Sequence, residues 1–201
     1  DIRIVAFIGP SGTGKSHRAQ MVAKSKNISY IIDDAILIHD NRVVAGTSAK
    51  RANTKIESVK RALFSFDGQA EEMKEAIKEK KPDAILILGT SDDMVDKIVK
   101  NLELPSVSER VYIQDVSSPQ EMELARSIRM SEGKHVIPVP TFEIKKDFSG
   151  YLLDPLQIFK WKGRGTTPYM TEKSIIRPTF SYLGKYIISD NVLRSIVEYA
   201  S

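Results

Sequence analysis

The chain has 201 residues, of which 41% are hydrophobic and 28% charged, a composition typical of a folded globular protein. It contains no cysteine, so disulfides, zinc–thiolate sites and cysteine nucleophiles are excluded. The formal net charge of +4 is small, and no apolar run approaches the ~18 residues that span a bilayer. We therefore expect one α/β domain with a small appendage, cytoplasmic and without a membrane span.

The first predicted element is a buried strand over the apolar residues 2–8, and a glycine-rich loop follows it directly. The loop reads G-P-S-G-T-G-K-S and matches the phosphate-binding pattern G-x-x-x-x-G-K-[ST] in full. Its glycines permit backbone conformations in which successive N–H groups converge on phosphate oxygens. Lys15 would reach the β- and γ-phosphates, and Ser16 would ligate Mg²⁺. The residues predicted to bind the nucleotide are Gly9, Pro10, Ser11, Gly12, Thr13, Gly14, Lys15, Ser16 and His17.

On this motif, residues 1–140 resemble the P-loop NTPases, and within that class the small kinases of the uridine-kinase and shikimate-kinase type. The resemblance implies a three-layer α/β fold, in which helices cover both faces of a parallel sheet, with ATP and Mg²⁺ as ligands. No N/T-K-x-D guanine-binding signature occurs, which favours ATP over GTP.

After the loop, an apolar stripe at Ala19, Val22 and Ala23 predicts a helix. A second strand is predicted over residues 28–32. Two short apolar runs on either side of a polar turn then predict a hairpin at 35–46. We expect this hairpin to be an insertion beside the nucleotide site and a candidate substrate flap.

The rest of this domain is predicted to alternate helices and strands. Ser118 and Glu121 form a capping box that starts a helix at Pro119, and Thr90 with Asp93 predicts the cap of an earlier one. The remaining elements are helices at 56–63, 70–77 and 94–102, and strands at 84–88, 111–113 and 136–139, the last suited to a sheet edge. Such alternation favours a parallel sheet whose strands end at one ligand-binding edge.

Three carboxylates are candidates for orienting the nucleophile or holding the metal. Asp33 and Asp34 end the second strand, where small kinases place an acidic residue, and we favour Asp33, then Asp34. The third strand ends in Gly89-Thr90-Ser91-Asp92, whereas a typical P-loop NTPase has an acidic residue immediately after the apolar run. Asp92 ranks third, since negative charge in the first turn of a helix also explains it.

Basic residues gather in the segment 47–62, which contains five cations and one carboxylate. Lys50 and Arg51 are the predicted site of a small anionic acceptor, between the hairpin and this segment. A solvated helix face explains the charge equally well. Nucleic-acid binding is not expected, because the net charge is small.

Two arginines, Arg126 and Arg129, lie on one face of the helix that starts at Pro119. In the small kinases a helix of this kind forms the lid over ATP, and guanidinium groups bind phosphate bidentately. The resemblance therefore implies that both arginines close over the phosphates; two solvated arginines are the alternative. Leu124 and Ile128 are expected to face the sheet.

The C-terminal third differs in character from the rest. Residues 141–182 are rich in aromatic residues and turns and have no helical period, which predicts an extended, strand-rich connector. Residues 183–201 resemble the start of the alkaline-shock envelope-stress family, with a glycine, a short strand and an I-S-D-x-V helix start. The resemblance implies a further domain that continues beyond Ser201 and a role in stress response.

Two functions follow from these patterns. The first is an Mg²⁺-dependent ATP-binding protein that transfers or hydrolyses the γ-phosphoryl group, with Lys15, Asp33, Arg126 and Arg129 as catalytic residues and Ser16 and Asp33 at the metal. The second is a nucleotide-responsive regulatory module with little or no turnover, read by the C-terminal domain. The incomplete acidic motif and the C-terminal resemblance favour the second.

Overall fold

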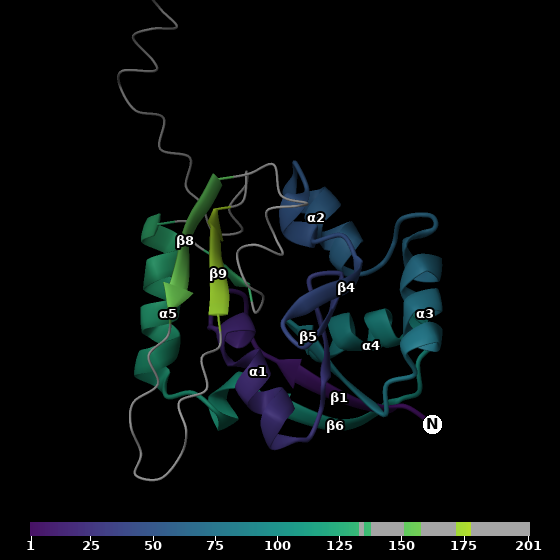
Figure 1. Ribbon diagram of the computed structural model, residues 1–201. Coiled ribbons are helices and arrows are strands. Elements are labelled where there is room, and N and C mark those ends of the chain that lie inside the picture. Colours follow the sequence, from purple (N-terminus) through teal and green to yellow (C-terminus); the bar gives the residue numbers. More distant parts are fainter. Residues whose placement is uncertain (133–134, 138–150, 158–171, 178–201) are drawn as a thin grey trace, which may run out of the picture.

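The computed structural model describes residues 1–132, 135–137, 151–157 and 172–177 (Figure 1). Its main body is an α/β fold built on a mixed six-stranded sheet with the strand order β4-β3-β2-β5-β1-β6. The strands are β1 (Arg3–Ile8), β2 (Tyr30–Asp33), β3 (Ile36–His39), β4 (Arg42–Gly46), β5 (Ala84–Gly89) and β6 (Val107–Tyr112). The α/β class expected from the sequence is confirmed.

The sheet is parallel over four strands, as expected, but the hairpin predicted as an insertion makes it mixed at one edge. Strands β2, β5, β1 and β6 run parallel, but β3 is antiparallel to both β2 and β4. The chain reverses after β2 within two residues, Asp34 (φ 48°) and Ala35 (φ 69°), and again at Asp40 (φ 47°) and Asn41 (φ 63°). Positive φ at both central residues is what the tight type I′ turn requires. The expected hairpin therefore extends the main sheet and is not a separate flap.

The helices occur where the sequence predicted them. They are α1 (Lys15–Ser25), α2 (Lys55–Ala62), α3 (Gln69–Lys80), α4 (Asp92–Asn101) and α5 (Pro119–Glu132), with short 3₁₀ turns η1 (Ala49–Arg51) and η2 (Ile113–Asp115). The capping box of α5 is confirmed, since Ser118 N donates to Glu121 Oε2 at 2.8 Å. The cap of α4 is Ser91, whose Oγ accepts from Met94 N, and not Thr90.

The core has two layers, one on each face of the sheet. On one face, Val22 of α1 packs in a cluster with Val5 and Phe7 of β1. On the other face, α3 and α4 cover Ile4 and Ala6 of the same strand. Strand β1 is thus buried from both sides, which explains its unbroken apolar sequence. The three-layer arrangement expected from the resemblance is present, with α1 and α4 on opposite faces.

Strand β6 begins earlier than the sequence predicted. Its first part contains the polar residues Ser108, Glu109 and Arg110, which an edge strand tolerates but which hide the strand from an apolar pattern.

A second, antiparallel sheet consists of β7 (His135–Ile137), β8 (Tyr151–Gln157) and β9 (Glu172–Arg177), in the order β7-β9-β8 (Figure 1). The strand expected near 136–139 is therefore an edge strand of this sheet, not of the main one. Strands β8 and β9 agree with the strand-rich prediction for 141–182. The stretch 183–201 lies outside the described residues.

Across the part of the chain that the structure describes, every helix is too short or too polar to cross a bilayer.

Candidate phosphate-binding cleft

The glycine-rich loop lies between two neighbouring strands, β1 and β5, whose connections lead to opposite sides of the sheet. From β1 the chain passes through α1 to β2 on one side, and from β5 it passes through α4 to β6 on the other. In open α/β sheets, ligands bind in the crevice at such a switch point, outside the carboxyl ends of the strands. The start of the loop is fixed there, since Gly9 N donates to Gly89 O at 3.2 Å.

The conformation of the loop backbone directs the N-terminus of α1 at this crevice. Gly14, the N-cap of α1, has φ 91°, and among the described residues no side chain caps this helix. Gly12 also has positive φ (81°), and Thr13 Oγ1 donates to Pro10 O at 2.7 Å. A side chain at Gly9 would lie 2.4 Å from Ile113 Cγ2, so the close packing beneath the loop requires glycine. An uncapped helix N-terminus after such a loop is an anion-binding arrangement.

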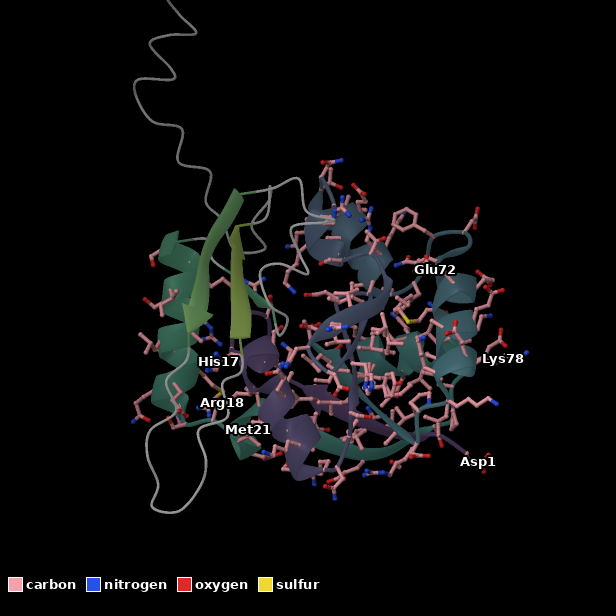
Figure 2. All side chains as sticks on the ribbon, viewed as in Figure 1. Asp1, His17, Arg18, Met21, Glu72 and Lys78 are labelled. Carbon is pink, nitrogen blue, oxygen red and sulfur yellow. The ribbon has the colours of Figure 1, made fainter. Side chains whose placement is uncertain are left out.

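A cleft of about 960 Å³ opens above the loop. Its walls are the loop and the start of α1, the segment from Lys50 to Leu63 including α2, the start of α4, and one face of α5. Figure 2 shows His17 and Arg18, which also line the cleft, on the side of α1 nearest α5. The cleft therefore brings together parts of the chain that are more than 100 residues apart.

Asp33 and Ser16 meet in this cleft. Ser16 Oγ donates to Asp33 Oδ2 at 2.6 Å, and Asp33 is only 5% exposed. Hydroxyl and carboxylate oxygens suit Mg²⁺. No group of three or more His, Asp or Glu side chains that could hold a metal occurs in the described part of the chain. A cation at Ser16 and Asp33 would thus take its other ligands from water and from phosphate.

The two other candidate carboxylates have different partners. Asp92 accepts from Arg110 Nη1 at 3.0 Å and from the Tyr112 hydroxyl at 3.1 Å, and it is not among the described residues that line the cleft. Asp34 lines the cleft and forms an ion pair with Lys50. The missing acidic residue after β5 also has a structural reason, because a side chain at Gly89 would lie 2.4 Å from Val95 Cγ2.

Lys15 turns back over the loop. Its Nζ donates to the carbonyl oxygens of Gly9 and Pro10. Burial lowers the pKa of Lys15 to about 8, the Asp33 carboxylate acts in the opposite direction, and the nearby Arg129 and Lys50 lower the pKa further. Burial and the two neighbouring cations thus outweigh the effect of Asp33 on the Lys15 ammonium group. An anion beside Lys15 would stabilise its charged form.

Lys50 is the cleft residue whose environment the sequence did not reveal. It is 5% exposed and pairs with Asp34, although its segment was equally consistent with a solvated face. Burial lowers the pKa of Lys50, while Asp33 raises it. The one local signal is the small residues around it, because Ser48, Ala49 and Ala52 are also buried. Arg51, predicted beside Lys50, is not among the described residues that line the cleft.

Of the two arginines of α5, only one lines the cleft. Arg129 lines the cleft, whereas Arg126 forms an ion pair with Glu123 at 3.5 Å and is not among the described lining residues. Leu124 and Ile128 do not face the sheet as expected; they line the cleft and are 62% and 40% exposed. The reason is the docking of α5 through Met122, which packs against the core cluster that contains α1 residues.

Of the nine residues predicted to bind nucleotide, the seven from Ser11 to His17 line the cleft. Gly9 and Pro10 lie behind them and hold Lys15 through their carbonyl groups.

Comparisons of the chain with protein-family models, with curated proteins and with solved structures found no match. The function must therefore be inferred from the cleft itself.

Proposed function

We propose that this chain is an Mg²⁺-dependent ATP-binding protein that transfers the γ-phosphoryl group to an acceptor or to water. The observation that carries the proposal is the 2.6 Å hydrogen bond between Ser16 and Asp33, beside the uncapped start of α1 and the buried Lys15. A hydroxyl, a carboxylate and a lysine at a glycine-rich loop are the groups that phosphoryl transfer needs for metal binding and charge stabilisation.

Each of these residues has a role in the proposal. Ser16 and Asp33 would hold Mg²⁺, which supplies charge neutralisation at the phosphates. Lys15 would leave the Gly9 and Pro10 carbonyls for the β- and γ-phosphates. Arg129 would contact the phosphates from α5, and Arg126 is the weaker candidate because it lies outside the cleft lining. The preference for ATP over GTP rests on the absence of a guanine-binding signature in the sequence.

The acceptor would occupy the part of the cleft between α2 and α4. Lys55, Val59 and Leu63 line it from one side, and Met94 and Lys97 from the other. These side chains suit a small acceptor with an anionic group and an apolar portion. Of the described residues that line the cleft, none comes from the hairpin 35–46, so the acceptor would lie further from the hairpin than the sequence indicated.

A nucleotide-responsive module with little turnover is the second candidate. Gly89 favours it, because the tight contact with Val95 leaves no room for the carboxylate that usually follows this strand in P-loop NTPases. Asp33 alone would then have to supply the charge at the metal.

Calorimetric titration of Mg-ATP into the wild-type protein, Lys15→Ala and the control Lys100→Ala tests the proposal. Lys100 is exposed on α4 and does not line the cleft. We expect wild type and Lys100→Ala to bind alike and Lys15→Ala to lose about 10-fold or more in affinity. Continued heat after binding would indicate turnover, and Lys15-dependent binding without it would support the second candidate. A wild-type protein that does not bind Mg-ATP would refute both.

A further inference from the structure

Three cations from separate parts of the chain meet at the phosphate loop. Lys15 begins α1, Lys50 belongs to η1 and Arg129 to α5, and all three line the same cleft. The carboxylates beside them are Asp33 and Asp34, and Asp33 is bonded to Ser16. The other carboxylates in the described lining are Asp93 of α4 and Glu121 of α5, and Glu121 is paired with Arg18. Among the described residues, three cations thus face the Asp33–Asp34 pair at the loop, an arrangement that attracts an anion.

The three cations are close enough to influence one another. Arg129 lowers the pKa of Lys50, and both Arg129 and Lys50 lower the pKa of Lys15. Repulsion of this kind is relieved when a multiply charged anion lies between the cations. The contacts show the same proximity, because Lys15 and Lys50 line one cleft and Lys50 pairs with Asp34, which directly follows the Asp33 bonded to Ser16. We therefore expect Lys50 to lie in the region where the terminal phosphate would be bound.

Lys50 is held in place by the backbone around it. Ala49 N donates to Asp34 O at 2.7 Å, and Lys50 N donates to Ser48 Oγ at 3.2 Å. The first bond ties η1 to the turn that joins β2 and β3, and the second caps the start of η1. Because Asp33 ends β2 and Asp34 follows it, the same turn positions the metal-site carboxylate and the partner of Lys50. The Lys50 side chain is thus a built part of the cleft wall.

We propose that Lys50 is a second phosphate-binding lysine, which contacts the terminal phosphate of the nucleotide together with Lys15 and Arg129. This inference rests on the proposed function and assigns a new role within the same cleft. Asp34 holds the Lys50 ammonium group at the wall, and the bound phosphate competes with Asp34 for it. The acceptor role expected for Lys50 from the sequence is thereby replaced by a role at the donor phosphate.

The competing explanation is structural: the Lys50–Asp34 pair would only anchor η1 to the β2–β3 turn. The two explanations predict opposite changes in nucleotide affinity when Asp34 loses its charge. If the pair is only an anchor, removing either partner breaks the same contact and weakens nucleotide binding in the same way. If Lys50 binds phosphate, removing Lys50 weakens binding, whereas removing the Asp34 charge frees Lys50 and strengthens it.

The experiment measures the affinities of Mg-ATP and Mg-ADP for the full chain, wild type, Lys50→Met and Asp34→Asn, by calorimetry. Methionine fills the buried space of the lysine stem, and asparagine tolerates the positive φ of Asp34. The double variant Asp34→Asn/Lys50→Met leaves no buried charge without its partner and guards against misfolding of a single variant. Circular dichroism verifies that each protein is folded.

We expect Lys50→Met to bind Mg-ATP about 10-fold more weakly and to lose much of the preference for ATP over ADP. Asp34→Asn should bind Mg-ATP more tightly than wild type, and the double variant should resemble Lys50→Met. Parallel losses in the two single variants, or wild-type affinity in the double variant, would overturn the role of Lys50 and leave the proposed function intact. Absence of binding in the wild type would overturn both.

Discussion

Asp33 is the residue on which the proposed metal site depends. The sequence marked it because an apolar strand ends there, and the structure brings it to Ser16 with β5 lying between β1 and β2 in the sheet. The sequence ranked Asp33 ahead of Asp34 and Asp92, but a one-dimensional pattern predicts the end of a strand and not which strands become neighbours. The contact of Asp33 with Ser16 therefore required the fold. Asp92 shows this, because its pairing with Arg110 and Tyr112 depends on the position of β6.

Replacement of Asp33 by asparagine should separate metal binding from nucleotide binding. Asparagine can still accept the hydrogen bond from Ser16, but it lacks the charge that Mg²⁺ prefers. We expect the ratio of ATP affinities with Mg²⁺ and with EDTA to fall about 10-fold in Asp33→Asn. Fluorescence or calorimetric titration measures this ratio.

Asp92→Asn serves as the matched control, since Asp92 lies outside the described lining of the cleft. It should keep the wild-type ratio. An undiminished ratio in Asp33→Asn would show that this carboxylate does not hold the metal.

At the scale of the elements, the sequence predicted the features that depend on neighbouring residues. It did not predict those that depend on contacts between distant parts of the chain. The apolar runs of β1 and β5 and the capping box of α5 lie within a few residues, and all were predicted. The β3–β4 hairpin was predicted, but the antiparallel pairing of β3 with β2 was missed because the Asp34-Ala35 turn lacks the glycine that usually marks such turns. The sequence did not show which side of α5 faces the cleft. Leu124 and Ile128 are apolar, so they were expected to face the sheet, but they line the cleft.

The packing of β4 against its neighbours provides a test at this scale. Gly46 has φ 85°, and an added Cβ would lie 2.1 Å from Ala35 O and 2.9 Å from Met73 Cε. Gly46→Ala should therefore lower the free energy of unfolding by about 3 kcal/mol, from backbone strain and steric overlap together. Urea denaturation followed by circular dichroism measures the change.

Gly68→Ala is the control for backbone strain alone. Gly68 also has positive φ, 76°, but an added Cβ would meet no atom within 4 Å. Its cost should be about 1 kcal/mol. Equal costs for the two variants would contradict the close approach at Gly46.

At the scale of the whole molecule, the cleft collects charges from α1, η1, β2 and α5. Lys15, Lys50, Arg129 and Asp33 influence one another only after the chain has folded. This explains why the sequence could indicate Lys50 as an anion-binding residue but could not predict its burial or its pairing with Asp34. It also gives the folded protein a response to pH that an isolated loop peptide would lack.

The affinity for Mg-ATP should decrease as the pH rises above about 8. Below this pH the Lys15 side chain, whose pKa is about 8, is protonated and attracts phosphate. Above it the free protein loses that proton and must regain it on binding, so affinity falls by up to about 10-fold per pH unit. The lowered pKa of Lys50 acts in the same direction.

Titrations between pH 7 and 9.5 measure this dependence. Lys15→Arg retains its charge throughout this range and should show a weaker decline. A wild-type affinity that stays constant up to pH 9.5 would contradict the role of Lys15 as the titrating group.

The strand order has a consequence for how the site is assembled. Ser16 lies shortly after β1 and Asp33 ends β2, yet these strands are separated in the sheet by β5, which is synthesised some 50 residues later. A growing or partly folded chain that lacks β5 has both residues and the connecting helix α1, but not the strand that pairs with both β1 and β2. We therefore expect the 2.6 Å contact between them to be set only when β5 has joined the sheet. Metal-dependent nucleotide binding would thus report that the central sheet is complete, and it could serve as a probe of late folding.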